Sequence, residues 1–161
     1  MEKRGISPLI ATVLLIGFTI TIAAILMIWG GNLVKERAEK ISARTEAQTS
    51  CTAKVEIGLN SAKCTTEDNK DIVKDIVKIS VENKGSDTIN AFRARINYDG
   101  DSETTTVYNL LNPTSQTSLK VEYDTSKGTP KSVIVFPVLN KQSLSYTCSE
   151  KSKEIEVEDC L

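Results

Sequence analysis

The stretch GISPLIATVLLIGFTITIAAILMIWGGNLV, residues 5–34, contains no charged side chain. As a helix, the part from Ile6 to Gly31 would be about 39 Å long, which exceeds the ~30 Å thickness of the hydrocarbon core of a bilayer. A helix that is apolar all round must be enclosed on every side. The stretch therefore predicts a helix that can span a membrane.

The residues that precede this stretch indicate its orientation and its processing. Lys3 and Arg4 lie directly before it, so the positive-inside rule places the N-terminus in the cytoplasm and everything after Val34 outside. A secretory signal would have a shorter apolar region, with a small-residue cleavage site on its far side. Here the small residue is Gly5, ahead of Ile6, so cleavage at this glycine would leave the apolar helix on the mature protein.

The sequence Lys3-Arg4-Gly5-Ile6-Ser7-Pro8-Leu9-Ile10-Ala11, which runs on to Trp29-Gly30, resembles the N-terminus of archaeal type IV pilins, relatives of the archaellins. In that family a prepilin peptidase in the membrane cuts after the glycine. The resemblance implies that residues 1–5 are a leader recognised through Lys3 and Arg4, and that the chain is cut between Gly5 and Ile6. It also implies a cytoplasmic assembly ATPase and a membrane platform protein as partners.

The resemblance leads us to expect a structural subunit that polymerises with copies of itself into a surface filament for adhesion or attachment. The precursor would lie in the membrane and the mature protein in an extracellular filament. Pro8 fits the first helical turn, where its missing N–H breaks no bond. The side chains expected to form the filament core are Pro8, Leu9, Ile10, Val13, Leu14, Ile16, Gly17, Phe18, Ile20, Ile25, Ile28 and Trp29.

Ile10 departs from the bacterial branch of the family, which usually carries a glutamate at this fifth mature position. Apolar packing would then set the register between subunits. We expect the helix to cover residues 6–49, with a bend or local melting at Gly30-Gly31, or simply the end of the membrane span there. Beyond these glycines, Val34, Ala38 and Ile41 recur at i, i+4 and i+7 among charged residues, which predicts an amphipathic half that lies against the rest of the protein.

Residues 50–161 are typical of β structure. Apolar and polar side chains alternate over residues 77–82, 92–98 and 119–123, and turn sequences separate the segments. Residues 133–138 are apolar on both faces, which predicts a central strand. The expected fold class is α+β: a long N-terminal hydrophobic α-helix followed by an all-β, sandwich-like (Ig-like) extracellular head of seven or eight strands.

The four cysteines, Cys51, Cys64, Cys148 and Cys160, all lie in the predicted head. An even number there indicates two disulfides in an oxidising compartment. Three connectivities are possible. We favour the local pairs Cys51–Cys64 and Cys148–Cys160, whereas a Cys51–Cys160 bond would join the two ends of the head. A zinc site is disfavoured because the chain lacks histidine and the C-x-x-C spacing.

The composition speaks against several other functions. The absence of histidine removes the commonest general base, and no phosphate-binding loop or nucleophile elbow is present, so we expect neither an enzyme nor a cofactor. The chain has 20 basic and 21 acidic residues with no basic patch, which disfavours nucleic acid as a partner.

Three acidic groups are candidate cation sites. Asp99, Asp101 and Glu103 surround Gly100. This pattern predicts a hairpin turn in preference to a calcium site. The polar sequence of residues 67–69 predicts a solvated loop. The glutamates at 154, 156 and 158 are typical of the outer face of an edge strand.

Two other classes of function fit the same sequence. A single-span, membrane-anchored extracellular binding module would need the same apolar helix but no cleavage at Gly5. A minor pilin or pseudopilin would be processed in the same way, yet it would prime or cap a filament instead of forming its length.

Overall fold

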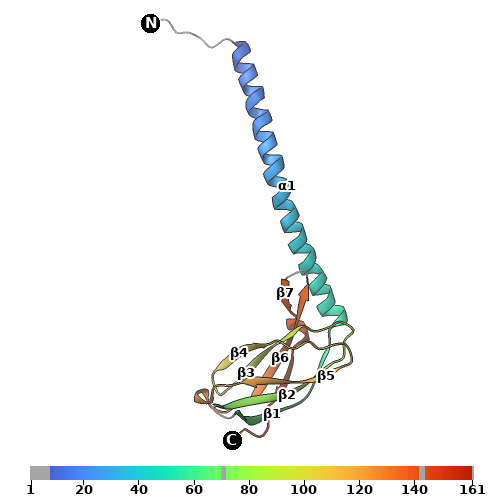
Figure 1. Ribbon diagram of the computed structural model, residues 1–161, viewed down its shortest axis with the longest axis vertical. Helices are drawn as coiled ribbons and strands as arrows, with labels where there is room; N and C mark the ends of the chain where they lie inside the picture. Colours follow the sequence, from blue (N-terminus) through green and yellow to red (C-terminus); the bar gives the residue numbers. More distant parts are fainter. Residues whose placement is uncertain (1–7, 70–71, 142–143, 161) are drawn as a thin grey trace. The chain divides into compact units, whose positions relative to one another are not determined.

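A computed structural model of the chain describes residues 8–69, 72–141 and 144–160. Within these residues, one helix, α1 (Pro8–Lys54), is followed by eight strands, and Figure 1 shows their arrangement. The chain divides into two compact units, and the boundary falls within α1 between Ser42 and Ala43. The fold class is therefore α+β, as predicted.

Helix α1 differs from the prediction in two respects. It extends to Lys54 instead of residue 49, so Cys51 is helical, and it continues without interruption through Gly30 and Gly31. The expected start at Ile6 lies outside the described residues. Two glycines in a helix of 47 residues cost only about 1 kcal/mol each, and neighbouring turns compensate for such a cost.

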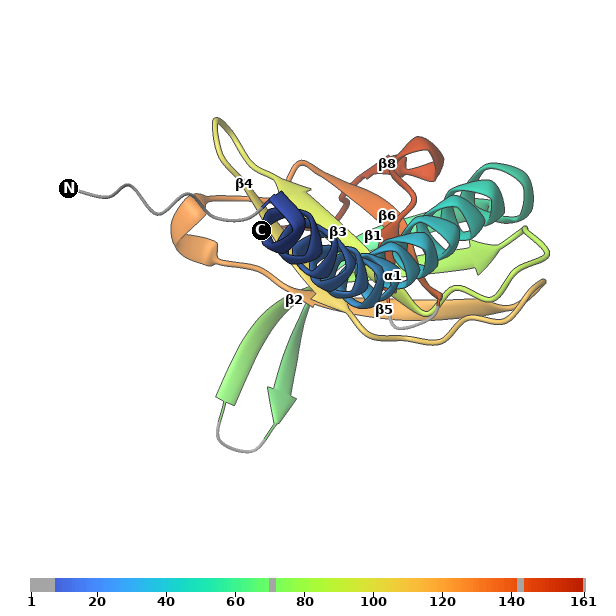
Figure 2. The ribbon, with the colours of Figure 1, turned by 90° about the horizontal axis from the view of Figure 1, so that it is seen from above.

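The strands form two antiparallel sheets (Figures 1 and 2). The first has the order β1-β2-β5, and the second has the order β4-β3-β6-β7, with β8 also paired to β6. The elements are β1 (Ile57–Asn69), β2 (Ile72–Asn83), β3 (Ala91–Asn97), β4 (Ser102–Val107), β5 (Gln116–Glu122), the 3₁₀ turn η1 (Thr125–Lys127), β6 (Ser132–Lys141), β7 (Leu144–Thr147), the 3₁₀ turn η2 (Ser149–Lys151) and β8 (Lys153–Glu156).

The core of the head lies between the two sheets. Val77, Ile79 and Val81 of β2 are fully buried, and so are Phe92 and Ile96 of β3 in the other sheet. Lys78 between two of these β2 residues is exposed, so the predicted alternation is confirmed. Two sheets that bury their inner faces against one another form a sandwich.

Strand β6 is central in its sheet, as its apolar sequence predicted. It pairs with β3 along one edge, while β7 and β8 share its other edge. Val133 and Val135 are fully buried, and Ile134 and Phe136 on the opposite face are half-buried. The predicted edge strand near residues 154–158 is also confirmed, since β8 pairs with β6 and keeps Glu154 and Glu156 exposed.

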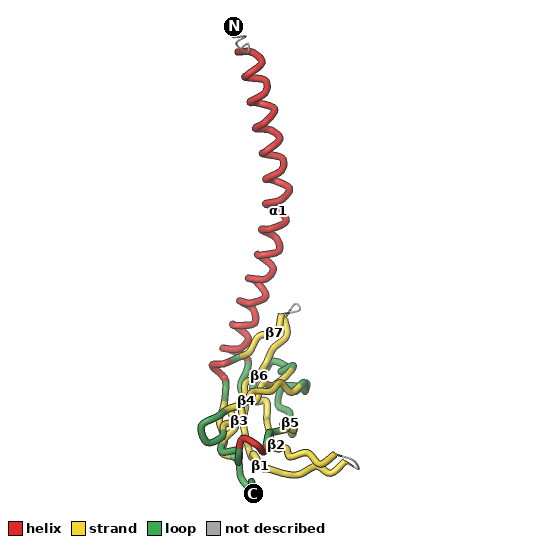
Figure 3. The backbone as a smooth tube through the Cα atoms, turned by 90° about the vertical axis from the view of Figure 1, so that its left-hand side faces the viewer, coloured by secondary structure: helices red, strands yellow, loops and turns green. Residues whose placement is uncertain are grey.

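The far part of the β1–β2 hairpin is a two-stranded ribbon (Figures 2 and 3). Strand β5 pairs with β2 only over Ile76–Glu82, so the pairs between residues 66–69 and 72–75 extend past it. The prediction of a loop at residues 67–69 was wrong, because these residues are the end of β1. Their polarity fits an exposed ribbon, and the Glu67 carboxylate forms an ion pair with Lys120 of β5.

Candidate assembly surface

The predicted filament-core side chains lie on α1 and are exposed. Between Leu9 and Val34, large apolar side chains are 40% to 80% exposed. Four successive ones, from Val13 to Ile16, are each at least 58% exposed, and four successive residues cover the whole circumference of a helix. The apolar surface therefore surrounds α1 and does not form a stripe.

Polar groups within this apolar stretch bond inside the helix itself. The hydroxyls of Thr12 and Thr19 donate to the carbonyls of Leu9 and Ile16, both at 2.9 Å, and the Thr21 hydroxyl donates to Gly17 at 2.7 Å. Because backbone groups in a helix are also paired internally, the segment can enter a medium without water. By length and composition, α1 can cross a membrane.

The predicted leader-recognition residues, Lys3 and Arg4, and the predicted cut between Gly5 and Ile6 lie outside the described residues.

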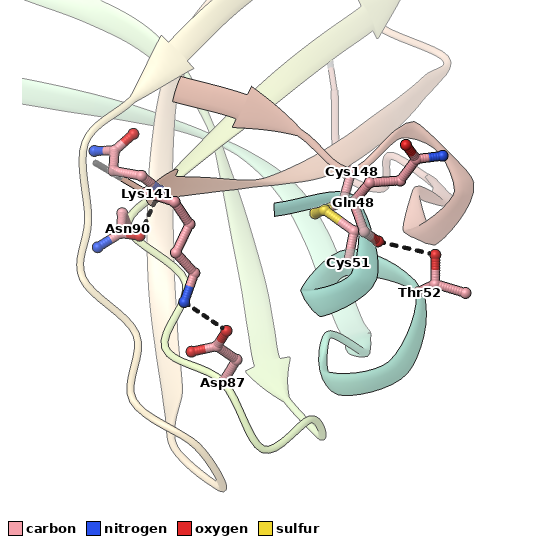
Figure 4. The surroundings of a disulfide bond; sticks show 8 residues. Gln48, Cys51, Thr52, Asp87, Asn90, Lys141 and Cys148 are labelled. Carbon is pink, nitrogen blue, oxygen red and sulfur yellow. Dashed lines mark hydrogen bonds and ion pairs between the residues drawn. A yellow bond between two sulfur atoms is a disulfide. The ribbon is translucent and has the colours of Figure 1, made fainter. Parts of the chain in front are cut away.

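The last turns of α1 belong to the head unit and are buried on one face. Ala43, Ala47, Ser50 and Cys51 are at most 5% exposed, and their spacing places them on one side of the helix. Cys51 forms a disulfide with Cys148, which follows β7 (Figure 4). The Cα atoms of the two cysteines are 5.4 Å apart.

The second disulfide joins Cys64 of β1 to Cys160. Next to it, Lys63 and Glu158 form an isolated parallel β-bridge, and the backbone N–H of Cys64 donates to the carbonyl of Glu158 at 3.0 Å. The C-terminal segment is thus fastened along the edge of the first sheet, which links that sheet to β8 of the second.

The favoured local pairing, Cys51–Cys64 with Cys148–Cys160, was wrong, and so was the alternative through Cys51–Cys160. Cys51 is in the last turn of α1, shortly before β1 begins at Ile57. Cys64 lies seven residue steps further along that extended strand. Seven such steps cover roughly 23 Å, far more than the ~5–6 Å between the Cα atoms of a disulfide. Both bonds instead join parts that are distant in sequence.

A loop from the sheet, residues 83–87, receives the C-terminus of α1. The backbone N–H groups of Ser86 and Asp87 donate to the carbonyl of Lys54, at 2.8 and 3.2 Å, and those of Lys84 and Gly85 donate to Glu56. The last carbonyls of a helix have no partner within the helix, and the loop satisfies that of Lys54. A Cβ on Gly85 would lie 2.2 Å from the Lys54 oxygen, so only glycine permits this approach.

Asn83 holds this loop in shape. Its side chain is fully buried, its Nδ2 donates to the carbonyls of Asp87 and Leu111 at 2.9 and 3.1 Å, and its Oδ1 accepts from the Gly85 N–H at 3.0 Å. The sequence Asn83-Lys84-Gly85-Ser86-Asp87 predicts a turn. Nothing in it indicates that the turn binds a helix end, because that partner is distant in sequence.

Asp87 adds an electrostatic contact to the same region. Its carboxylate forms an ion pair with Lys141 at 3.1 Å (Figure 4). Burial acts to raise the pKa of Asp87, but hydrogen bonds from Lys141, the Thr88 N–H and the Ser50 hydroxyl outweigh it, so the pKa is lowered overall. The charged form of Asp87 is therefore the stabilising one.

The acidic residues around Gly100 form the predicted hairpin turn between β3 and β4, and Gly100 has a positive φ of 90°. Their carboxylates contact lysines: Asp99 pairs with Lys131 at 2.9 Å, and Glu103 with Lys127 at 3.3 Å. Burial, followed by the hydrogen bond to Glu103, raises the pKa of the Tyr98 hydroxyl. Over the described residues, no group of three potential ligands is arranged to hold a metal ion.

No family model, curated protein or solved structure matches this chain.

Proposed function

We propose that the protein is a pilin, a structural subunit of an archaeal type IV pilus-like surface filament. The observation that carries the proposal is the apolar surface that surrounds α1 from Leu9 to Val34. The resemblance of residues 3–30 to archaeal pilins supports it. The two disulfides support an extracellular head, because such bonds persist in oxidising compartments.

The proposed mechanism is an exchange of surroundings for α1. Lipid encloses the helix before assembly, and identical helices enclose it in the filament core afterwards. Both surroundings are apolar, so the hydrophobic effect changes little, and extraction requires work from the proposed ATPase and platform protein. The proposed peptidase removes residues 1–5 before this step.

The structure of the head suits a subunit that is carried by its helix. The end of α1 is fixed in the head by the Cys51–Cys148 bond, by the loop at residues 83–87 and by buried Ala43 and Ala47. The polar outer faces of the sheets would form the outside of the filament and set its adhesion.

The deciding experiment is to shear the surface of producing cells and to determine the N-terminal peptide of this protein in the sheared fraction by mass spectrometry. We expect a start at Ile6. A start at Met1 or Glu2, or absence of the protein from that fraction, would contradict the proposal and favour an anchored binding module.

A matched pair of variants tests the proposed cleavage directly. Replacement of the residue before the cut, Gly5→Leu, should leave an uncut protein in the membrane and none in the sheared fraction. Glu2→Gln changes the leader without touching the cut, and it should be processed and assembled like the wild type.

A further inference from the structure

The outer face of the second sheet carries opposite charges on two of its strands. On β3, Arg93 and Arg95 are exposed, while the residues that alternate with them are buried in the core. On β8, Glu154 and Glu156 are exposed. Because alternate residues of a strand share one face, each pair forms a column along its strand. We refer to these pairs as the arginine column and the glutamate column.

An apolar column on β6 lies between the two charged columns. In the register of the sheet, Ile134 is opposite Arg95 on one side and Glu154 on the other. Residues directly opposite one another share a face, so these three side chains form one row across the sheet. Ile134 and Phe136 are half-buried and form the apolar column. Two strand spacings, about 10 Å, separate the backbone of the arginine column from that of the glutamate column.

The charges of the two columns do not neutralise one another within one copy. Among the residues that the structure describes, neither Arg93 nor Arg95 has an ion-pair partner. The Glu154 carboxylate instead accepts a hydrogen bond from the Ser132 hydroxyl at 2.6 Å. A guanidinium group matches a carboxylate with two parallel hydrogen bonds, and such pairs are stronger than neutral ones. The face therefore offers both cations and anions to an outside partner.

The order of the columns makes this face complementary to itself. A second copy can be turned by 180° about an axis that runs along β6 in the plane of contact. Its arginine column then lies over the glutamate column of the first copy, its glutamate column lies over the arginine column, and the two apolar columns meet on the axis. Because the rows keep their level in this rotation, Arg95 of each copy faces Glu154 of the other. An axis across the strands would place arginine over arginine, where like charges repel.

We propose that this face forms a two-fold contact between the heads of two copies, in which Arg95 and Glu154 pair twice around a centre of Ile134 and Phe136. Such a contact is isologous and closed. The copies that it joins follow from the proposed function, on which this step rests. Subunits within one filament follow one another by a screw rotation and all point the same way, so a two-fold contact joins heads of different filaments. It would hold filaments side by side in bundles.

The size of the face explains why single copies should not pair through it. Four strands over three or four residues cover roughly 300 Å² on each copy, so the contact stays below the ~1,200 Å² of a stable interface. Two filaments present many such faces, and once one contact forms, the next is effectively intramolecular. The ion pairs lie near solvent and are screened by salt, so bundles should loosen as the ionic strength rises.

The test exchanges charges in the full chain in producing cells, and electron microscopy measures the fraction of filaments in bundles. Arg95→Glu places glutamate opposite Glu154 and should lower this fraction at least tenfold, and Glu154→Arg should do the same. The double variant again places opposite charges together and should restore bundling. Lys78→Glu is the matched control, because it makes the same change of charge on the exposed face of β2 in the first sheet. It should leave bundling unchanged.

A crosslink tests the centre of the contact. The photo-reactive residue p-benzoylphenylalanine replaces Phe136, and isotopically light and heavy filaments are grown separately, mixed and irradiated. Crosslinked peptides that combine light and heavy chains then come only from different filaments. We expect them to join position 136 of one copy to residues 132–136 of another, whereas the same probe at Lys78 should give no mixed peptide with this segment. Unchanged resistance of the filaments to protease would show that the heads still fold.

The outcomes separate the two proposals. Filaments that start at Ile6 would overturn the two-fold contact alone if they never bundle, if Arg95→Glu leaves them bundled or if the double variant stays dispersed. Crosslinks from position 136 only to other regions, to a glycan or to another protein would do the same. If the wild-type chain forms no filament, the proposed function fails. The same variants are then compared by the aggregation of vesicles that display the full chain, and equal aggregation would overturn the contact as well.

Discussion

In the head, apolar side chains are buried by other parts of the same chain, whereas along α1 from Leu9 to Val34 they stay exposed. Val77, Ile79 and Val81 stabilise the fold because the opposite sheet covers them. The side chains from Val13 to Ile16 are equally apolar but contribute nothing to the fold of a single copy. The difference is that hydrophobic surface in the head is used for folding, while that of α1 from Leu9 to Val34 is not.

The largest expected change in stability follows removal of the disulfide that fixes the end of α1 in the head. We expect Cys51→Ala with Cys148→Ala to lower the free energy of unfolding by about 4–5 kcal/mol, because the bond closes a loop of nearly 100 residues. Denaturant unfolding of the full chain in detergent measures it.

The Cys64→Ala, Cys160→Ala variant is the matched control, since its loop is almost as long. It should lose less stability, because Cys64 and Cys160 are half-buried while Cys51 and Cys148 lie in the core. A larger loss for this second pair would contradict the importance assigned to the end of α1.

The next prediction distinguishes the role of the apolar stretch of α1 from that of the head. Ile16→Asp places a charge in the middle of the apolar stretch, which costs about 2.5–3.5 kcal/mol at the centre of a membrane. We expect filaments to disappear from the sheared fraction, while the unfolding of the head in detergent is unchanged. Ile16→Val is the control and should assemble normally. A simultaneous loss of head stability would show that the regions are not independent.

A smaller effect concerns the loop that receives α1. Gly85→Ala should destabilise the head by about 2–3 kcal/mol, because the new methyl group overlaps the Lys54 carbonyl and backbone has to move. Gly58→Ala is the control, since its methyl group would meet only the flexible end of Lys84. Equal melting temperatures for the two variants would contradict this explanation.

The smallest effect depends on pH. Asp87→Asn should lower the free energy of unfolding by about 1–2 kcal/mol at pH 7, since it removes a charge-assisted hydrogen bond. The folded pKa of Asp87 is lowered, so its stabilisation is present above the ordinary pKa of about 3.9 and is lost as pH falls through the folded value. Unfolding curves of both proteins should therefore converge below pH 4.

Local patterns predicted the larger part of this fold. The alternation at Val77, Ile79 and Val81 indicated a strand with one buried face, and the apolar residues 133–138 indicated the central strand. Both signals lie within a few residues of the feature that they predict. The same holds for the apolar helix and for the hairpin turn at Gly100.

Features that depend on distant parts of the chain could not be predicted in this way. Cys51 meets Cys148 because the end of α1 lies beside the end of β7, and the sequence contains no sign of that contact. The role of Asn83 follows from the positions of Leu111 and the loop. Polar residues 67–69 form a strand because β2 pairs with them.

The bond between Cys51 and Cys148 also governs how the molecule responds to tension. A pull that passes from α1 to the residues after Cys148 crosses through the two sulfur atoms and does not load the backbone between them. That shielded backbone, if unravelled, would lengthen by on the order of 300 Å. With the bond intact, such a pull would leave the two sheets folded.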